Sequence, residues 1–122
     1  MSGKKILIVD DQPNVRTVLA EMFKNQGYLV ETAENGEVGI QKAREYQPEL
    51  LIMDIMMPVK DGLSAAREIK ADPDLQSIPI LFLTARGQKQ DEENARAAGA
   101  DGFITKPFSP RRIMETVSSM LG

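Results

Sequence analysis

The stretch Leu50-Leu51-Ile52-Met53-Asp54 limits the folds open to this chain more than any other part of it. Its four consecutive apolar residues leave no polar face, which is typical of a strand covered on both sides in a parallel sheet. The run ends at a carboxylate, and Pro58 follows shortly after it. Because ligands bind at the carboxyl edge of open α/β sheets, we expect Asp54 to lie where a functional group can act.

Strand-like and helix-like segments alternate five times along the chain. We expect strands at residues 6–9, 28–33, 50–54, 80–84 and 101–105, and helices at about 13–26, 37–46, 63–71, 88–98 and 110–121. The apolar stripe of the first helix is predicted to comprise Val15, Val18, Leu19, Met22 and Phe23. The alternation predicts an α/β fold of the flavodoxin-like, doubly wound type, with five helices on a five-stranded parallel sheet of strand order 2-1-3-4-5.

The length and composition fit one small domain. With 122 residues the chain is long enough for one core, so we expect a single domain over residues 1–122. It has no cysteine and no histidine, which excludes disulfides, cysteine or histidine metal sites and histidine-based catalysis. The net charge of −3 offers no basic surplus for nucleic acid, and no apolar run is long enough to cross a membrane. We therefore expect a cytoplasmic protein that binds neither nucleic acid nor a membrane.

Side chains that can perform chemistry lie at the ends of four expected strands. Asp10 and Asp11 follow the first strand, Asp54 and Thr84 end the third and fourth, and Lys106 follows the fifth. In the predicted strand order the first and third strands are neighbours, so three carboxylates meet at one edge. Three carboxylates repel one another unless a cation intervenes, and an all-oxygen cluster favours Mg²⁺. With a lysine and a hydroxyl to bind phosphate oxygens, the cluster predicts a phosphoryl-accepting site whose nucleophile is Asp54.

Four motifs, in this order, resemble the receiver domain of bacterial two-component response regulators, of the single-domain chemotaxis type. They span residues 8–11, 54–62, 83–85 and 99–108. A lone acid pair would be weak support, but the four motifs together cover essentially the whole chain with family-like spacing. The resemblance implies a phosphorylation-activated switch in a phosphorelay. It implies no enzymatic activity other than the chain's own phosphoryl transfer and autodephosphorylation.

The resemblance also implies how the acidic cluster works. Asp54 would accept a phosphoryl group from the phosphohistidine of a sensor histidine kinase or a phosphotransfer protein. Asp11, Asp54 and the backbone carbonyl of Met56 would bind Mg²⁺ directly. Asp10 would act more through water.

The other matching residues link the site to the surface. Thr84 and Lys106 would bind the phosphoryl group, and the peptide bond between Lys106 and Pro107 is expected to be cis. Phe103 matches an aromatic switch position whose side chain turns inward when Thr84 moves. A downstream protein would then recognise the face formed by the helix at 88–98, the strand at 101–105 and the last helix, on a monomer or weak dimer.

Other functions compete with this interpretation. A receiver could act as a protein-interaction module without phosphorylation, although the complete set of site residues argues against it. A flavodoxin-like flavin carrier would need a phosphate-binding loop after the first strand, where Asp10-Asp11-Gln12-Pro13-Asn14 repels anions. A small Mg²⁺-dependent phosphatase would need a second carboxylate as general acid near Asp54, and a cap over its substrate.

Overall fold

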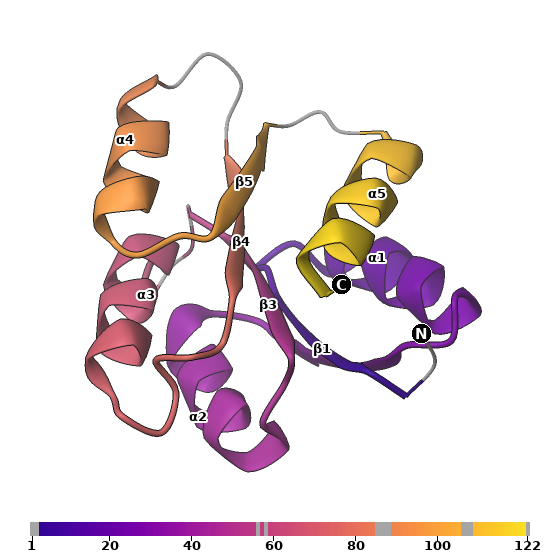
Figure 1. Ribbon diagram of the computed structural model, residues 1–122, viewed down its shortest axis with the longest axis horizontal. Helices are drawn as coiled ribbons and strands as arrows, with labels where there is room; N and C mark the ends of the chain where they lie inside the picture. Colours follow the sequence, from indigo (N-terminus) through magenta and orange to yellow (C-terminus); the bar gives the residue numbers. More distant parts are fainter. Residues whose placement is uncertain (1–2, 56, 58, 85–88, 106–108, 122) are drawn as a thin grey trace.

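The computed structural model describes residues 3–55, 57, 59–84, 89–105 and 109–121, and only the backbone of residue 84 and of residues 89–91. Strands and helices alternate along them (Figure 1). The strands are β1 (Lys5–Val9), β2 (Leu29–Ala33), β3 (Leu50–Asp54), β4 (Ile80–Thr84) and β5 (Gly102–Thr105). The helices are α1 (Pro13–Asn25), α2 (Gly36–Tyr46), α3 (Gly62–Ala71), α4 (Lys89–Ala97) and α5 (Pro110–Leu121). Within these segments no helix is both long and apolar enough to cross a membrane.

The strands form one parallel sheet in the order β2-β1-β3-β4-β5. The register aligns Val9 of β1 with Met53 of β3, and Asp54 of β3 with Leu83 of β4. Parallel pairing places the carboxyl ends of all these strands at one edge of the sheet. The predicted fold class, a flavodoxin-like doubly wound sheet with five helices, is confirmed.

Helices cover both faces of the sheet (Figure 1). Leu51 and Met53 of β3 belong to the core under α2, α3 and α4, whereas Leu50 and Ile52 belong to the core under α1 and α5. The side chains of β3 therefore alternate between two cores, and every residue of the strand is buried. This position explains why the strand has an unbroken apolar run, because neither of its faces meets water.

The first helix departs from prediction at Val18. Leu19 and Phe23 are buried as expected, but Val18 is 56% exposed. It lines a cavity of about 270 Å³ between α1 and α5, together with Met22 and Ile113. The apolar stripe of α1 is wider than its contact with the sheet, so one edge of the stripe borders this cavity instead of the core.

Candidate functional site

Three carboxylates meet where β1 and β3 end. The two strands are neighbours in the sheet, and Asp10 directly follows β1 while Asp54 is the last residue of β3. One carboxylate oxygen from each of Asp10, Asp11 and Asp54 lies within 4.8 Å of the other two. Asp10 is fully buried and Asp54 is 7% exposed, whereas Asp11 is the accessible member. The structure thus brings together the three acids that the sequence predicts to meet.

Hydrogen bonds hold Asp10 in place at the turn between β1 and α1. The Asp10 N–H donates to the carbonyl of Ala33 at 3.1 Å, which continues the pairing of β1 with β2. The Oδ1 atom of Asp10 accepts a hydrogen bond from the Gln12 N–H at 2.9 Å. The Arg16 guanidinium donates to the Asp10 carbonyl at 2.6 Å. These bonds turn the chain from strand into helix around Asp10, and they hold its carboxylate at the sheet edge.

The chain beyond Asp54 returns closely to the end of β3. The Ile55 N–H donates to the carbonyl of Leu83 at 3.3 Å, and the Gly62 N–H donates to the carbonyl of Ile55 at 2.8 Å. A β-carbon at position 62 would overlap the Asp54 carbonyl oxygen and would lie 2.9 Å from the Ile55 Cα. Gly62 is therefore required by the close approach of two backbone segments, and it joins the two ends of the loop that follows Asp54.

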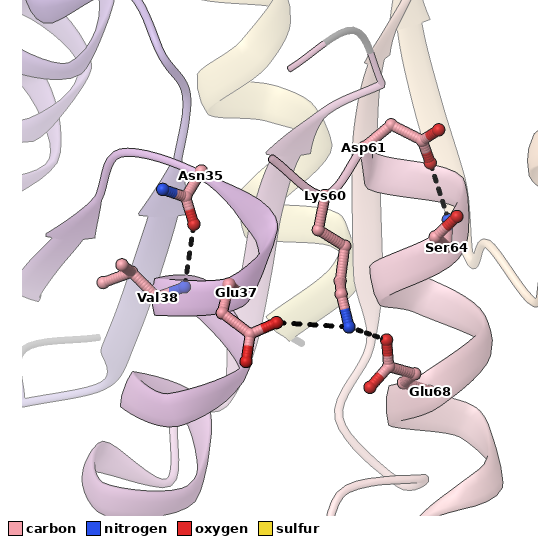
Figure 2. A network of polar contacts seen from close by, with 7 residues as sticks. All are labelled: Asn35, Glu37, Val38, Lys60, Asp61, Ser64 and Glu68. Atoms are coloured by element: carbon pink, nitrogen blue, oxygen red, sulfur yellow. Dashed lines mark hydrogen bonds and ion pairs between the residues drawn. The ribbon is translucent and has the colours of Figure 1, made fainter. Parts of the chain in front are cut away.

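A polar network ties this loop to α2 and α3 (Figure 2). Its members are Asn35, Glu37, Val38, Lys60, Asp61, Ser64 and Glu68. The side chains of Asn35 and Asp61 accept hydrogen bonds at the N-termini of α2 and α3. Lys60 lies between Glu37 of α2 and Glu68 of α3. Sequence reasoning missed Lys60, because its partners come together only when α2 packs against α3.

Part of the predicted phosphate-binding set can be placed from the backbone. Thr84 is the last residue of β4 and pairs with Thr105 of β5, at the same sheet edge as the acidic cluster. The predicted ligand carbonyl of Met56, the phosphate-binding Lys106 and the cis bond to Pro107 lie outside the described residues. Their roles stay predictions.

Phe103, the predicted aromatic switch, lies partly buried on β5. Its ring packs against the core under α2, α3 and α4, and the Arg96 guanidinium of α4 lies 4.8 Å from the ring centroid. This distance is that of a cation–π contact. The side chain thus stands between the core and the surface of α4, and its inward rotation stays a prediction.

The acidic cluster fits a hard divalent cation. Its donors are the carboxylate oxygens of Asp10, Asp11 and Asp54, in a chain that has no histidine or cysteine. Oxygen donors of this kind favour Mg²⁺, which commonly keeps waters beside one or two carboxylates. A bound cation would also offset the repulsion among three negative charges held this close together.

A doubly wound five-stranded parallel sheet with an acidic cluster at its carboxyl edge matches the arrangement that the receiver-domain resemblance implies. The family model of the response regulator receiver domain matches residues 6–118. The chain belongs to this family, whose members are signalling modules of two-component systems.

Known relatives agree with this assignment. The chain is 38% identical over 119 residues to the chemotaxis protein CheY of Halobacterium salinarum, covering 98% of each chain. It is 37% identical over 117 residues to the transcriptional regulatory protein ResD of Bacillus subtilis, covering 96% of this chain but 48% of that protein. The receiver domain of the sensor histidine kinase PA1611 from Pseudomonas aeruginosa superposes with a TM-score of 0.91 at 33% identity, covering 99% of each chain. That structure is described with a magnesium ion coordinated in its active site cleft.

Proposed function

We propose that this chain is a phosphorylation-activated switch in which Asp54 accepts a phosphoryl group from a phosphohistidine. The donor would be a sensor histidine kinase or a phosphotransfer protein, in the cytoplasm. The observation that carries the proposal is the acidic cluster at the carboxyl edge, where Asp54 ends a fully buried strand beside Asp10 and Asp11. The chain would not turn over an external substrate, and it would lose its own phosphoryl group by autodephosphorylation.

The chemistry is a single phosphoryl transfer to a carboxylate. An oxygen of Asp54 attacks phosphorus, and the new P–O bond forms as the P–N bond to the donor histidine breaks. The electron pair of that bond returns to the imidazole nitrogen, and an acyl phosphate remains on Asp54. The Thr84 hydroxyl and the Lys106 ammonium bind the oxygens of the transferred group in this proposal.

The same proposal assigns Mg²⁺ to the acidic cluster. Asp10, Asp11, Asp54 and the backbone carbonyl of Met56 would hold it, with the donor chemistry described above and the magnesium-bound PA1611 receiver as support. When bound, Mg²⁺ supplies positive charge that neutralises the transferring phosphoryl oxygens. The hydrogen bond from the Gln12 N–H orients the buried carboxylate of Asp10 in the cluster.

The output would be a change at the surface formed by α4, β5 and α5. Movement of Thr84 toward the phosphoryl group would make room for Phe103 to turn inward, away from Arg96. Because α4 and β5 share that contact, its loss would shift the population of surface conformations that a downstream protein recognises. The switch would act as a monomer or a weak dimer.

The test is intact mass after incubation with acetyl phosphate, with and without Mg²⁺. We expect the wild type to gain one phosphoryl group only with Mg²⁺, and the adduct to be released by hydroxylamine, as an acyl phosphate is. Asp54→Asn keeps the size of the side chain and should gain nothing. Asp74→Asn, an exposed carboxylate in the turn after α3, should behave as the wild type.

Two results would overturn the proposal. A folded wild type that gains no mass would favour a receiver that acts as an interaction module without phosphorylation. A gain that persists in Asp54→Asn would mean that another carboxylate is the acceptor, and Asp11 is the next candidate because it is the accessible member of the cluster.

A further inference from the structure

Lys60 joins the loop after Asp54 to both helices that cover this side of the site (Figure 2). Its ammonium lies 3.3 Å from Oε2 of Glu37, in the first turn of α2, and donates a hydrogen bond to Oε2 of Glu68 on α3. The Lys60 side chain is 22% exposed, whereas both glutamates are about half exposed. The hydrogen bond to Glu68, followed by the contact with Glu37, raises the pKa of Lys60 above its usual value.

The backbone of Lys60 makes a second attachment to α2. Its carbonyl accepts a hydrogen bond from the N–H of Gly36, the first residue of that helix, at 3.1 Å. A β-carbon at position 36 would lie 2.5 Å from the Lys60 carbonyl oxygen, so only glycine permits this approach. Lys60 is thus held to α2 both at its main chain and at the end of its side chain.

These attachments act on a loop whose ends are already fixed beside Asp54. The Gly62 N–H binds the Ile55 carbonyl at 2.8 Å and closes the loop. Val59, directly before Lys60, has φ of 68° and is 81% exposed. A left-handed conformation is costly for a β-branched residue, so neighbouring contacts must maintain it. The attachments of Lys60 are the nearest described contacts that can do so.

We propose that Lys60 is a positioning residue that sets the affinity of the acidic cluster for its divalent cation. By bridging Glu37 and Glu68, it keeps the loop that follows Asp54 against α2 and α3, in the conformation that leaves the cluster ready for the ion. The inference rests on the proposed function in taking a divalent cation as the ligand of Asp10, Asp11 and Asp54.

The test compares Lys60→Met with Lys70→Met, which replaces a lysine of similar exposure near the opposite edge of the sheet. Lys70 is 23% exposed and binds Asp101 at 3.2 Å and the carbonyl of Ile78 at 3.0 Å, ahead of β4. Mg²⁺ affinity is measured by NMR titration, and hydrogen exchange of the Gly36 amide is measured without Mg²⁺. We expect Lys60→Met to weaken Mg²⁺ binding roughly two- to fivefold, as loss of an ion-pair network allows. Exchange at Gly36 should become faster.

The two controls separate positioning from general stability. Lys60→Arg keeps the charge and should retain most of the Mg²⁺ affinity. Lys70→Met should lower the unfolding midpoint without changing Mg²⁺ affinity or exchange at Gly36. If Lys60→Met fails to fold, Glu37→Gln and Glu68→Gln weaken the same bridge from its acidic side and should each weaken Mg²⁺ binding.

An unchanged Mg²⁺ affinity in folded Lys60→Met would overturn the inference, and so would an equal loss in Lys70→Met or a wild type that binds no Mg²⁺. These readouts do not depend on phosphoryl transfer. A wild type that binds Mg²⁺ but takes no phosphoryl group would therefore remove the proposed acceptor function, while Lys60 would still be judged by Mg²⁺ affinity and by exchange at Gly36.

Discussion

At the scale of single residues, the site depends on two glycines, which have no β-carbon, as well as on its carboxylates. Asp54 can be followed by a tight loop only because Gly62 has no side chain where the chain returns to β3. Gly36 allows the same kind of approach to the Lys60 carbonyl. Neither glycine has a positive φ, so backbone crowding and not conformational freedom explains both positions.

We therefore expect Gly62→Ala to destabilise the protein by about 1–3 kcal/mol, the usual range for inserting a methyl group into a packed site. The added carbon would push on the backbone of Asp54 and Ile55, so Mg²⁺ binding should weaken as well. Urea unfolding gives the stability and a Mg²⁺ titration gives the affinity. Gly102→Ala is the matched control, because its β-carbon would meet only side chains, at 3.4 Å or more. Equal stability of the two variants would contradict this account.

At the scale of elements, the sequence pattern predicts what local periodicity and burial determine. The apolar run at 50–54 is a strand buried on both faces, as predicted, and the last helix covers the predicted range, with Ile113 and Val117 buried. The expected burial of Val18 is wrong, because the periodicity of an apolar stripe does not indicate how much of that stripe a neighbouring element covers. The second strand also starts one residue later than expected, since Tyr28 bonds back to Phe23 at the end of α1.

A helix cap gives the prediction that belongs to this scale. Asp61 precedes α3, and its carboxylate accepts a hydrogen bond from the Ser64 N–H at 2.8 Å. Asp61→Ala should lower the free energy of unfolding by about 1 kcal/mol, because it leaves that amide without its side-chain acceptor. Asp61→Asn retains an oxygen that can accept the bond and should lose much less. Chemical denaturation of the three proteins measures both effects, and an alanine variant as stable as the asparagine variant would show that this cap contributes nothing.

At the scale of the whole molecule, parallel topology makes the acidic cluster predictable. Asp10 and Asp54 are 44 positions apart in sequence, yet Asp10 directly follows β1 and Asp54 ends β3, and neighbouring parallel strands bring their ends together. The link from Lys60 to Glu37 follows no such rule. This contact requires α2 to pack against α3 and the loop that follows Asp54 to run beside both helices. Strand and helix patterns specify neither.

Because the acidic cluster is the proposed Mg²⁺ site, we expect the stability of the whole domain to depend on Mg²⁺. Three carboxylates within 4.8 Å repel one another in the metal-free fold, and a cation that binds only the folded state stabilises it. At 100 times the dissociation constant the gain is about 2.7 kcal/mol, which would raise the thermal midpoint by on the order of 10 °C. NaCl at matched ionic strength separates this gain from screening.

Substitution of the accessible acid should change stability in opposite directions with and without Mg²⁺. Asp11→Asn removes one of the three like charges, so the variant should be at least as stable as the wild type in metal-free buffer. It also removes a ligand. If binding becomes tenfold weaker, the gain at the same Mg²⁺ concentration falls to about 1.4 kcal/mol. Thermal scans with and without Mg²⁺ measure the metal-free stability and the gain in stability from Mg²⁺. Asp74→Asn should match the wild type in both. A full Mg²⁺ gain in Asp11→Asn would mean that the ion binds elsewhere, because the folded state can gain stability only from the site that holds it.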